Sequence, residues 1–290
     1  MNAPLFQGCA TALLTPFKNG KIDYPAFGRL IDSQIENGIS ALVACGTTGE
    51  PATMTEAEWE GVLSFVVKQA KGRVPVIAGT GGNNTLAVIE KAKKAKALGA
   101  DAQLCVTPFY NKTTQAGLIA HYRAVARGTE LPVIIYNVPA RTGLNMLPAT
   151  LASLAEEENV IAMKEASGNV SQIMEMMRLC GDQIAFYSGS DELTAPILAL
   201  GGKGVISVLS NIAPRLMADL AAAAPAEAAK MNIALLPLMN ALMSEVNPIP
   251  VKAAANMLGL CRNEVRLPLI PMSREKKAIL KQAMQKAGIL

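Results

Sequence analysis

Short apolar runs rich in β-branched residues recur along the chain at intervals of about thirty residues, the size of one strand–helix unit. Stretches with the apolar spacing of amphipathic helices lie between them, for example at 23–38, 55–72 and 85–100. Because the runs are apolar throughout rather than alternating, they are typical of a parallel sheet covered on both faces. The runs are 9–15, 41–45, 74–78, 102–106, 133–136, 160–164, 184–187 and 205–208.

Eight such units in succession predict an α/β fold, a closed (β/α)8 TIM barrel. After the eighth run the helical pattern continues over about 226–246, 250–258 and 274–287, as a C-terminal helical extension. We therefore expect a catalytic barrel at 1–224 and a C-terminal helical domain at 225–290. The alternative is an open doubly wound sheet, but GTGGNN at 79–84 lacks the third glycine of a dinucleotide-binding turn.

Charge and cysteine usage exclude several classes of partner. A balance of 27 basic against 23 acidic residues is too mild for a nucleic-acid-binding face, and the lysine-rich stretch at 91–96 is expected to be a solvated helix face. The five cysteines are far apart and odd in number, which favours buried free thiols in a reducing compartment. With neither a signal-peptide pattern nor an apolar stretch of membrane-spanning length, we expect a cytoplasmic protein without a membrane partner.

The ends of the predicted strands carry the unusual residues. In a barrel of this kind the chemistry lies at the C-terminal ends of the strands. A tyrosine at a strand end is by itself as well explained by packing, but three of them together with Lys164 and Arg141 indicate a site. These segments are GTTGE at 46–50, TPFYN at 107–111, YNVPARTG at 136–143, KEASGN at 164–169, YSGSDE at 187–192 and GVISVLSN at 204–211.

Other catalytic devices are missing from the sequence. The single histidine, His121, falls in the helix after the fourth strand, where we expect a helix-surface residue rather than a catalyst. This placement argues against histidine-based triads and histidine-rich metal sites. The acids at strand ends are few and scattered, so we expect no metal and no tightly bound cofactor.

Lys164 closes a strand whose other residues are apolar. Apolar surroundings disfavour the ammonium form and lower the pKa of a lysine, and the neutral amine condenses with carbonyl compounds to form a Schiff base. The resulting iminium withdraws electrons, so the adjacent carbon can lose a proton and react as an enamine. The alternative is a snorkelling lysine or one paired with Glu165, and the strand alone leaves both interpretations open.

Neighbouring strand ends supply groups that suit this chemistry. The fork of Arg141 can bind a carboxylate with two hydrogen bonds. Thr47 and Thr48 can hold a second carboxylate or relay a proton, and Tyr136 can move that proton if its hydroxyl lies near the imine.

Five motifs in this order resemble a known family: GTTGE, YNVPARTG, KEASGN, GGKGVISV and NPIPVKAA. The chain is similar, nearly end to end, to the dihydrodipicolinate synthases (4-hydroxy-tetrahydrodipicolinate synthases), lyases of the N-acetylneuraminate lyase superfamily. The resemblance implies that pyruvate forms a covalent imine with Lys164 and condenses with L-aspartate 4-semialdehyde in lysine and diaminopimelate biosynthesis. The alternative within the superfamily is another Schiff-base aldolase, acting on a keto-acid sugar or a hydroxy-keto-acid.

The resemblance also assigns roles to individual residues. Tyr136 and Thr48 match an acid/base tyrosine and its relay threonine, and Tyr110 matches a tyrosine that completes the relay across a subunit interface. Arg141 matches the arginine that binds the carboxylate of the semialdehyde. A relay across an interface implies an oligomer, in this family commonly a homotetramer built as a dimer of dimers. The remaining matches are Thr47 and Thr48 near the pyruvate carboxylate and Gly189 and Ile206 lining the pocket.

Many members of the family are inhibited by lysine, and this chain departs from the residues that commonly bind it. Ala87 stands where a glutamate would hold the ammonium group of lysine, and Phe109 lacks a tyrosine hydroxyl. An unpaired ammonium group in a partly buried cleft is costly. We therefore expect weak or absent lysine inhibition. The matching positions are Pro51, Ala52, Glu56, Trp59, Asn83, Ala87 and Phe109.

Overall fold

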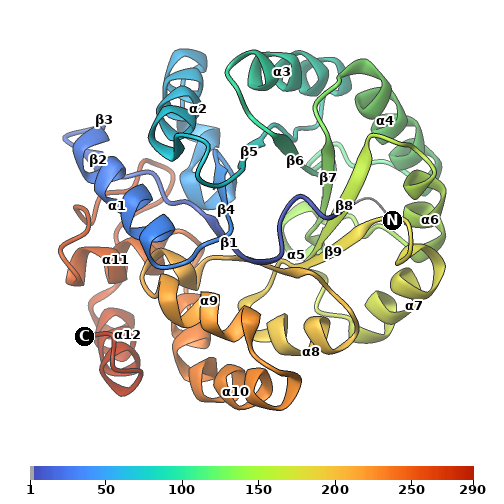
Figure 1. The fold of residues 1–290 in the computed structure, drawn as a ribbon. Coiled ribbons are helices and arrows are strands. Elements are labelled where there is room, and N and C mark those ends of the chain that lie inside the picture. The colour runs from blue at the N-terminus through green and yellow to red at the C-terminus, as the bar shows by residue number, and fades with distance from the viewer. Residues whose placement is uncertain (1–2) are drawn as a thin grey trace.

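The computed structural model describes residues 3–290 and contains the expected barrel. Eight parallel strands close on themselves in the order β1-β10-β9-β8-β7-β6-β5-β4, and helices surround them as a ring (Figure 1). The barrel strands are β1 Gly8–Ala12, β4 Ala41–Ala44, β5 Val76–Gly79, β6 Ala102–Val106, β7 Val133–Asn137, β8 Val160–Glu165, β9 Ala185–Ser188 and β10 Gly204–Ser207.

All eight predicted strands are confirmed, with ends that differ by up to three residues. A hairpin of β2 (Phe17–Lys18) and β3 (Lys21–Ile22) was not predicted, because two-residue strands leave no periodic pattern. The helices are α1 Tyr24–Glu36, α2 Glu56–Ala70, α3 Thr85–Ala97, α4 Gln115–Gly128, α5 Pro139–Thr142, α6 Pro148–Ala155, α7 Val170–Cys180, α8 Thr194–Ala199, α9 Pro214–Ala222, α10 Pro225–Leu242, α11 Ile249–Met257 and α12 Arg274–Lys286.

Helix α2 shows how the sequence sets the element boundaries. The Thr55 hydroxyl accepts a hydrogen bond from the Glu58 backbone, and the Glu58 carboxylate accepts one from the Thr55 backbone, which completes a capping box. At its C-terminal end Gly72 has a φ of +68°, a left-handed conformation that glycine adopts without a steric penalty.

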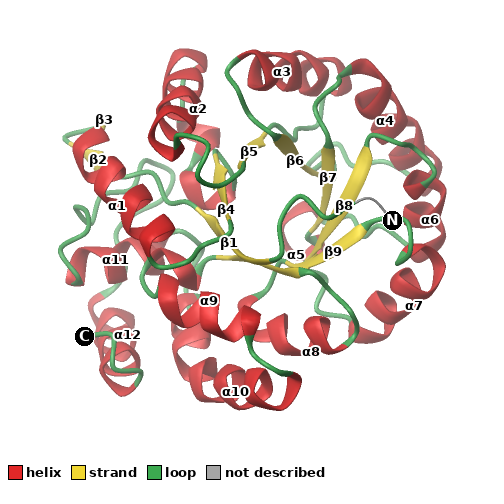
Figure 2. Ribbon diagram, in the orientation of Figure 1, coloured by secondary structure: helices red, strands yellow, loops and turns green. Residues whose placement is uncertain are grey.

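The C-terminal helices pack against the barrel and extend its core. Helix α10 contacts α8, α9 and α12, and α11 contacts both α10 and α12. Helices α11 and α12 lie outside the ring of barrel helices (Figure 2). Leu238 of α10 and Val251 of α11 belong to the same buried apolar cluster as Leu42 of β4. The predicted boundary at 224/225 falls in the short link between α9 and α10. Among the helices of residues 3–290, none has the length and apolar character needed to cross a bilayer.

A buried ion pair joins the extension to the barrel. The Lys252 ammonium group of α11 contacts the Glu50 carboxylate of the loop after β4, and both side chains are almost fully buried. Lys252 also donates to the Glu264 carbonyl at 2.9 Å, while the Arg266 backbone donates to Glu50 at 2.9 Å. The Lys252 ammonium group lies 3.9 Å from the centre of the Phe17 ring. The pair therefore fixes the turn that carries Thr47 and Thr48 against α11.

Removal of one partner from this pair should destabilise the protein. Lys252→Ala leaves the Glu50 carboxylate buried without a counter-charge, so we expect a loss of about 3–5 kcal/mol in the free energy of unfolding. Urea unfolding followed by the fluorescence of the single tryptophan, Trp59, measures this loss. The double variant Glu50→Gln/Lys252→Met should lose less, because no charge is left unpaired. A Lys252→Ala loss no larger than that of Lys281→Ala, at an exposed position of α12, would contradict the expectation.

Candidate active site

A cavity of about 560 Å³ opens at the C-terminal ends of the strands. Six of the predicted site residues line it. Two of them lie in strands β7 and β8, and the other four lie in the segments that follow β4, β7 and β9. Ile206 of β10 is instead buried in the apolar cluster inside the barrel and does not line this cavity. The six are Thr47, Thr48, Tyr136, Arg141, Lys164 and Gly189.

Strand register places Lys164 beside Tyr136. The two residues are direct partners in the β7–β8 pairing, and the Lys164 ammonium group lies 4.3 Å from the centre of the Tyr136 ring. Both side chains are buried, with 4% and 7% of their surfaces exposed. Gly189 leaves room for the lysine, because a Cβ atom there would lie 3.1 Å from Lys164 Cε and closer still to Ala166.

Burial has the largest effect on the titration of both groups. It lowers the pKa of Lys164 to about 8; the charge of Asp191 opposes this shift and that of Arg141 adds to it. Burial raises the pKa of Tyr136 to about 12, so its phenol keeps its proton at neutral pH. Near neutral pH, the neutral amine of Lys164 is therefore much more populated than in an ordinary lysine.

The alternative pairing of Lys164 with Glu165 is wrong. Successive residues of a strand face opposite sides, and the Glu165 carboxylate accepts hydrogen bonds from Asn137 Nδ2 at 3.0 Å and the Ser167 backbone at 2.5 Å. Within residues 3–290, Lys164 forms no ion pair. Of the two interpretations of Lys164, the structure agrees with the desolvated amine.

Asp191 is a buried acid near Lys164 that the sequence analysis did not single out. One oxygen of its carboxylate accepts hydrogen bonds from the backbones of Val208 at 3.2 Å and Leu209 at 2.9 Å. These bonds tie the loop after β9 to the loop after β10. The sequence signal for Asp191 was its position in YSGSDE, directly after a predicted strand. That position does not indicate whether the side chain is buried.

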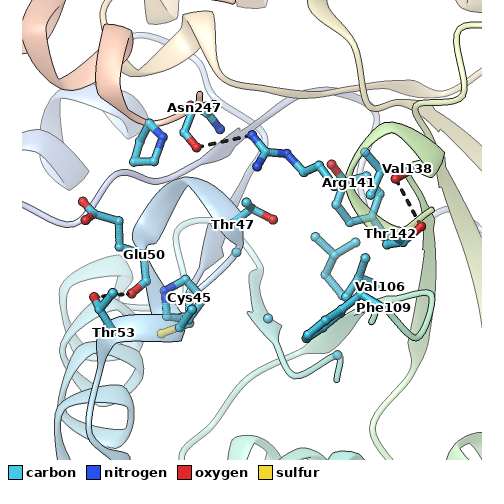
Figure 3. Close-up of a pocket in the computed structure, with 18 of the residues that line it drawn as sticks. Cys45, Thr47, Glu50, Thr53, Val106, Phe109, Val138, Arg141, Thr142 and Asn247 are labelled. Carbon is cyan, nitrogen blue, oxygen red and sulfur yellow. Dashed lines mark hydrogen bonds between the residues drawn. The ribbon is translucent and has the colours of Figure 1, made fainter. Parts of the chain in front are cut away.

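Asn247 is a second residue that the sequence analysis missed. Its side-chain amide donates to the Thr48 hydroxyl at 2.9 Å. Its backbone carbonyl accepts from Arg141 Nη2 at 3.3 Å (Figure 3). Asn247 begins the NPIPVKAA motif, directly before α11. The extension therefore contacts residues at the ends of two barrel strands.

Tyr110 lies apart from these residues within this chain. It follows β6, has a φ of +67° and is 91% exposed. A second cavity of about 500 Å³ adjoins the first (Figure 3). Both cavities are lined by Thr47, Tyr136, Arg141 and Asn247. The neighbouring Phe109 lines this second cavity.

The structure corrects the expectations for His121 and Lys91. His121 is buried rather than on the helix surface; its Nδ1 atom lies 2.9 Å from the Thr85 hydroxyl, and burial lowers its pKa to about 4. Lys91 is partly buried, with its ammonium group 4.7 Å from the Trp59 ring, whereas Lys93, Lys94 and Lys96 are exposed.

Tyr187 does not join the cavity. Its ring stacks on Phe6 with centroids 4.1 Å apart, and its hydroxyl donates to the Phe6 carbonyl at 2.8 Å. Of the three tyrosines at strand ends that we expected in the site, only Tyr136 lines the Lys164 cavity within one chain. In residues 3–290, no group of three or more histidine, cysteine, aspartate or glutamate side chains is placed to hold a metal ion.

Comparisons with known proteins place the chain in a family. Residues 5–287 match the dihydrodipicolinate synthetase family. The chain belongs to this family. The 4-hydroxy-tetrahydrodipicolinate synthase of Geotalea uraniireducens (strain Rf4) is 49% identical over 290 residues, which cover 99% of this chain and all of the relative. The family, the full-length match and the barrel together identify an enzyme, a lyase with 4-hydroxy-tetrahydrodipicolinate synthase activity.

Solved structures of the family have the same fold. A monomeric dihydrodipicolinate synthase variant matches with a TM-score of 0.97 at 43% identity, over 99% of this chain and 98% of that one. The enzyme of Cyanidioschyzon merolae, solved with lysine bound, matches with a TM-score of 0.95 at 41% identity, over 99% of this chain and all of that one.

Proposed function

We propose that the chain condenses pyruvate with L-aspartate 4-semialdehyde through an imine on Lys164, with no metal and no bound cofactor. The observation that carries this proposal is Lys164 itself, a buried amine with a pKa lowered to about 8 beside a protonated phenol. Other superfamily members share such a lysine, so the choice of acceptor rests on Arg141 and on the family match.

The proposed reaction begins with attack of the neutral Lys164 amine on the ketone carbon of pyruvate. Water leaves, and the protonated imine draws electrons from the adjacent methyl group, which loses a proton to give an enamine. The enamine carbon attacks the aldehyde carbon of the second substrate, and the aldehyde oxygen takes up a proton. The amino group of that substrate then attacks the imine carbon, which closes the ring and releases Lys164.

Tyr136 is the proposed proton carrier, and the centre of its ring lies 4.3 Å from the Lys164 amine. Because burial raises the pKa of its phenol to about 12, it can donate a proton to a departing hydroxyl or a new alkoxide near neutral pH and recover it afterwards. Thr48 is the proposed relay to this phenol, and the hydrogen bond from Asn247 orients its hydroxyl. Thr47 lines the same cavity and is the proposed partner of the pyruvate carboxylate.

Tyr110 would complete the relay only from a second subunit. Its exposure of 91% supports an assembly in which it enters the neighbouring site, and we propose a homotetramer built as a dimer of dimers. All five cysteines are buried and free, which supports the proposed cytoplasmic location.

Arg141 is the proposed binding group for the carboxylate of L-aspartate 4-semialdehyde. Its side chain is exposed at the mouth of the cavity, and the Asn247 carbonyl holds one of its nitrogens at 3.3 Å. A guanidinium group suits a small acidic aldehyde, whereas a sugar acceptor is better served by neutral hydrogen-bonding groups.

Turnover with both substrates tests the proposal most directly. Robust turnover, followed through a coupled dihydrodipicolinate reductase, is expected for the natural chain, and Lys164→Ala should reduce it by about a thousandfold or more. Borohydride with pyruvate should add the mass of the reduced adduct to the natural chain and not to Lys164→Ala. Trapping without turnover would favour a different aldehyde acceptor, and a variant with full turnover would refute the role of Lys164.

The pH dependence of trapping follows from the lowered pKa of Lys164. The nucleophile is the neutral amine, so the initial rate of imine formation should rise between pH 6 and 8 and level off above about 8. An ordinary lysine would show the rise near its usual pKa of about 10.4. Mass spectrometry of samples reduced at successive pH values measures the rate, and a rate that keeps rising from pH 8 to 10 would contradict the lowered pKa.

We further propose that lysine inhibits this enzyme weakly. Glu56, the remaining acid among the matching positions, is paired with Lys94, and Asn83 donates to the Phe109 carbonyl at 3.2 Å. The Lys91 ammonium group lies against Trp59 and would repel a second cation. These positions therefore offer lysine a poor counter-charge.

At about 1 mM lysine, more than half of the activity should remain. We expect a Kd for lysine above about 1 mM, which corresponds to a binding free energy of less than about 4 kcal/mol. The double variant Ala87→Glu/Phe109→Tyr should become more sensitive, and Ala87→Gln/Phe109→Tyr is its uncharged control. Half-inhibition of the natural chain at micromolar lysine would refute this proposal.

A further inference from the structure

Two loops of opposite charge flank the strand that carries Lys164. Strand β8 lies between β7 and β9, and Lys164 is in register with Tyr136 on one side and Tyr187 on the other. Arg141 and Glu192 each lie five residues beyond the registered tyrosine of their own strand. Because neighbouring strands are about 4.8 Å apart, both long side chains start within reach of the space above Lys164.

Glu192 and Glu245 are the acids among the residues that line the Lys164 cavity. Glu245 is already engaged: its carboxylate accepts from the Ser273 backbone at 3.4 Å and lies 3.9 Å from the Lys276 ammonium group. Glu192 is exposed and, within residues 3–290, has no ion-pair partner. Glu192 itself lines the cavity that contains Lys164 and Arg141.

We propose that Glu192 binds the ammonium group of an α-amino aldehyde whose carboxylate is held by Arg141, and so selects amino aldehydes over aldehydes that lack the amino group. This inference rests on the proposed function, in which the second substrate carries both charges. Near Lys164 and Arg141 a further cation is disfavoured unless an anion accompanies it. Among the described residues that line the cavity, Glu192 is the carboxylate without an ion pair, and its loop follows β9, on the opposite side of β8 from the loop that carries Arg141.

A pair of aldehydes that differ only in the amino group tests this role. L-aspartate 4-semialdehyde and succinic semialdehyde have the same chain and carboxylate, and mass spectrometry of rapidly quenched single-turnover mixtures with the pyruvate-loaded enzyme measures how fast either aldehyde is consumed by the enamine. We expect Glu192→Gln to slow condensation of the amino aldehyde about fivefold at low concentration, the size of a solvent-exposed ion pair. Condensation of succinic semialdehyde should change less than twofold.

Three comparison variants make the assignment specific. Glu192→Asp should recover part of the preference for the amino aldehyde, because it keeps the charge. Arg141→Ala should slow both aldehydes, since both carry the carboxylate. Glu245→Gln, at the other acid of the cavity, should leave the ratio of the two rates as it is in the natural chain.

The outcomes separate this inference from the proposed function. If the natural chain traps no pyruvate on Lys164, the proposed function itself fails. If trapping occurs and Glu192→Gln leaves the ratio of the two rates unchanged, whether both rates fall or neither does, the role of Glu192 is refuted. A loss of preference in Glu245→Gln rather than Glu192→Gln would also overturn the assignment.

Discussion

Closure of the barrel is the constraint on which the rest of the structure depends. Strand β1 pairs with both β10 and β4, so no strand can slip in register without opening the ring. This fixed register places Lys164 level with Tyr136 and surrounds the lysine with buried neighbours. The lowered pKa of the Lys164 amine is thus a consequence of the fold, because desolvation by the closed barrel is its largest cause.

The C-terminal helices are part of the site as well as of the core. Asn247, directly before α11, contacts Thr48 and Arg141, and Lys252 within α11 pairs with Glu50. One short segment of the extension therefore reaches both sides of the GTTGE turn and the loop after β7. The buried pair and the apolar contacts of α11 keep that segment in place, so the extension has a direct effect on the orientation of hydroxyl and guanidinium groups in the cavity.

The sequence predicted what depends on local pattern and missed what depends on distant contacts. Apolar runs located every barrel strand, and the place of Lys164 at the end of one of them was sufficient to single it out. The bond from Asn247 to Thr48 spans 199 residues, and no local pattern indicates such a contact. The burial of His121 and the turn of Tyr187 toward Phe6 likewise depend on neighbours from other parts of the chain.

The residues proposed to react with the first substrate lie in different elements from those proposed to bind the second substrate. Lys164 and Tyr136 lie within strands, where hydrogen bonding to two neighbours holds them rigidly, whereas Arg141 and Glu192 lie beyond strand ends and Asn247 lies between α10 and α11. Loops tolerate substitution better than a closed sheet does. A change of acceptor aldehyde can therefore be made by altering the loops after β7 and β9 and the segment before α11, without disturbing the lysine proposed to hold the first substrate.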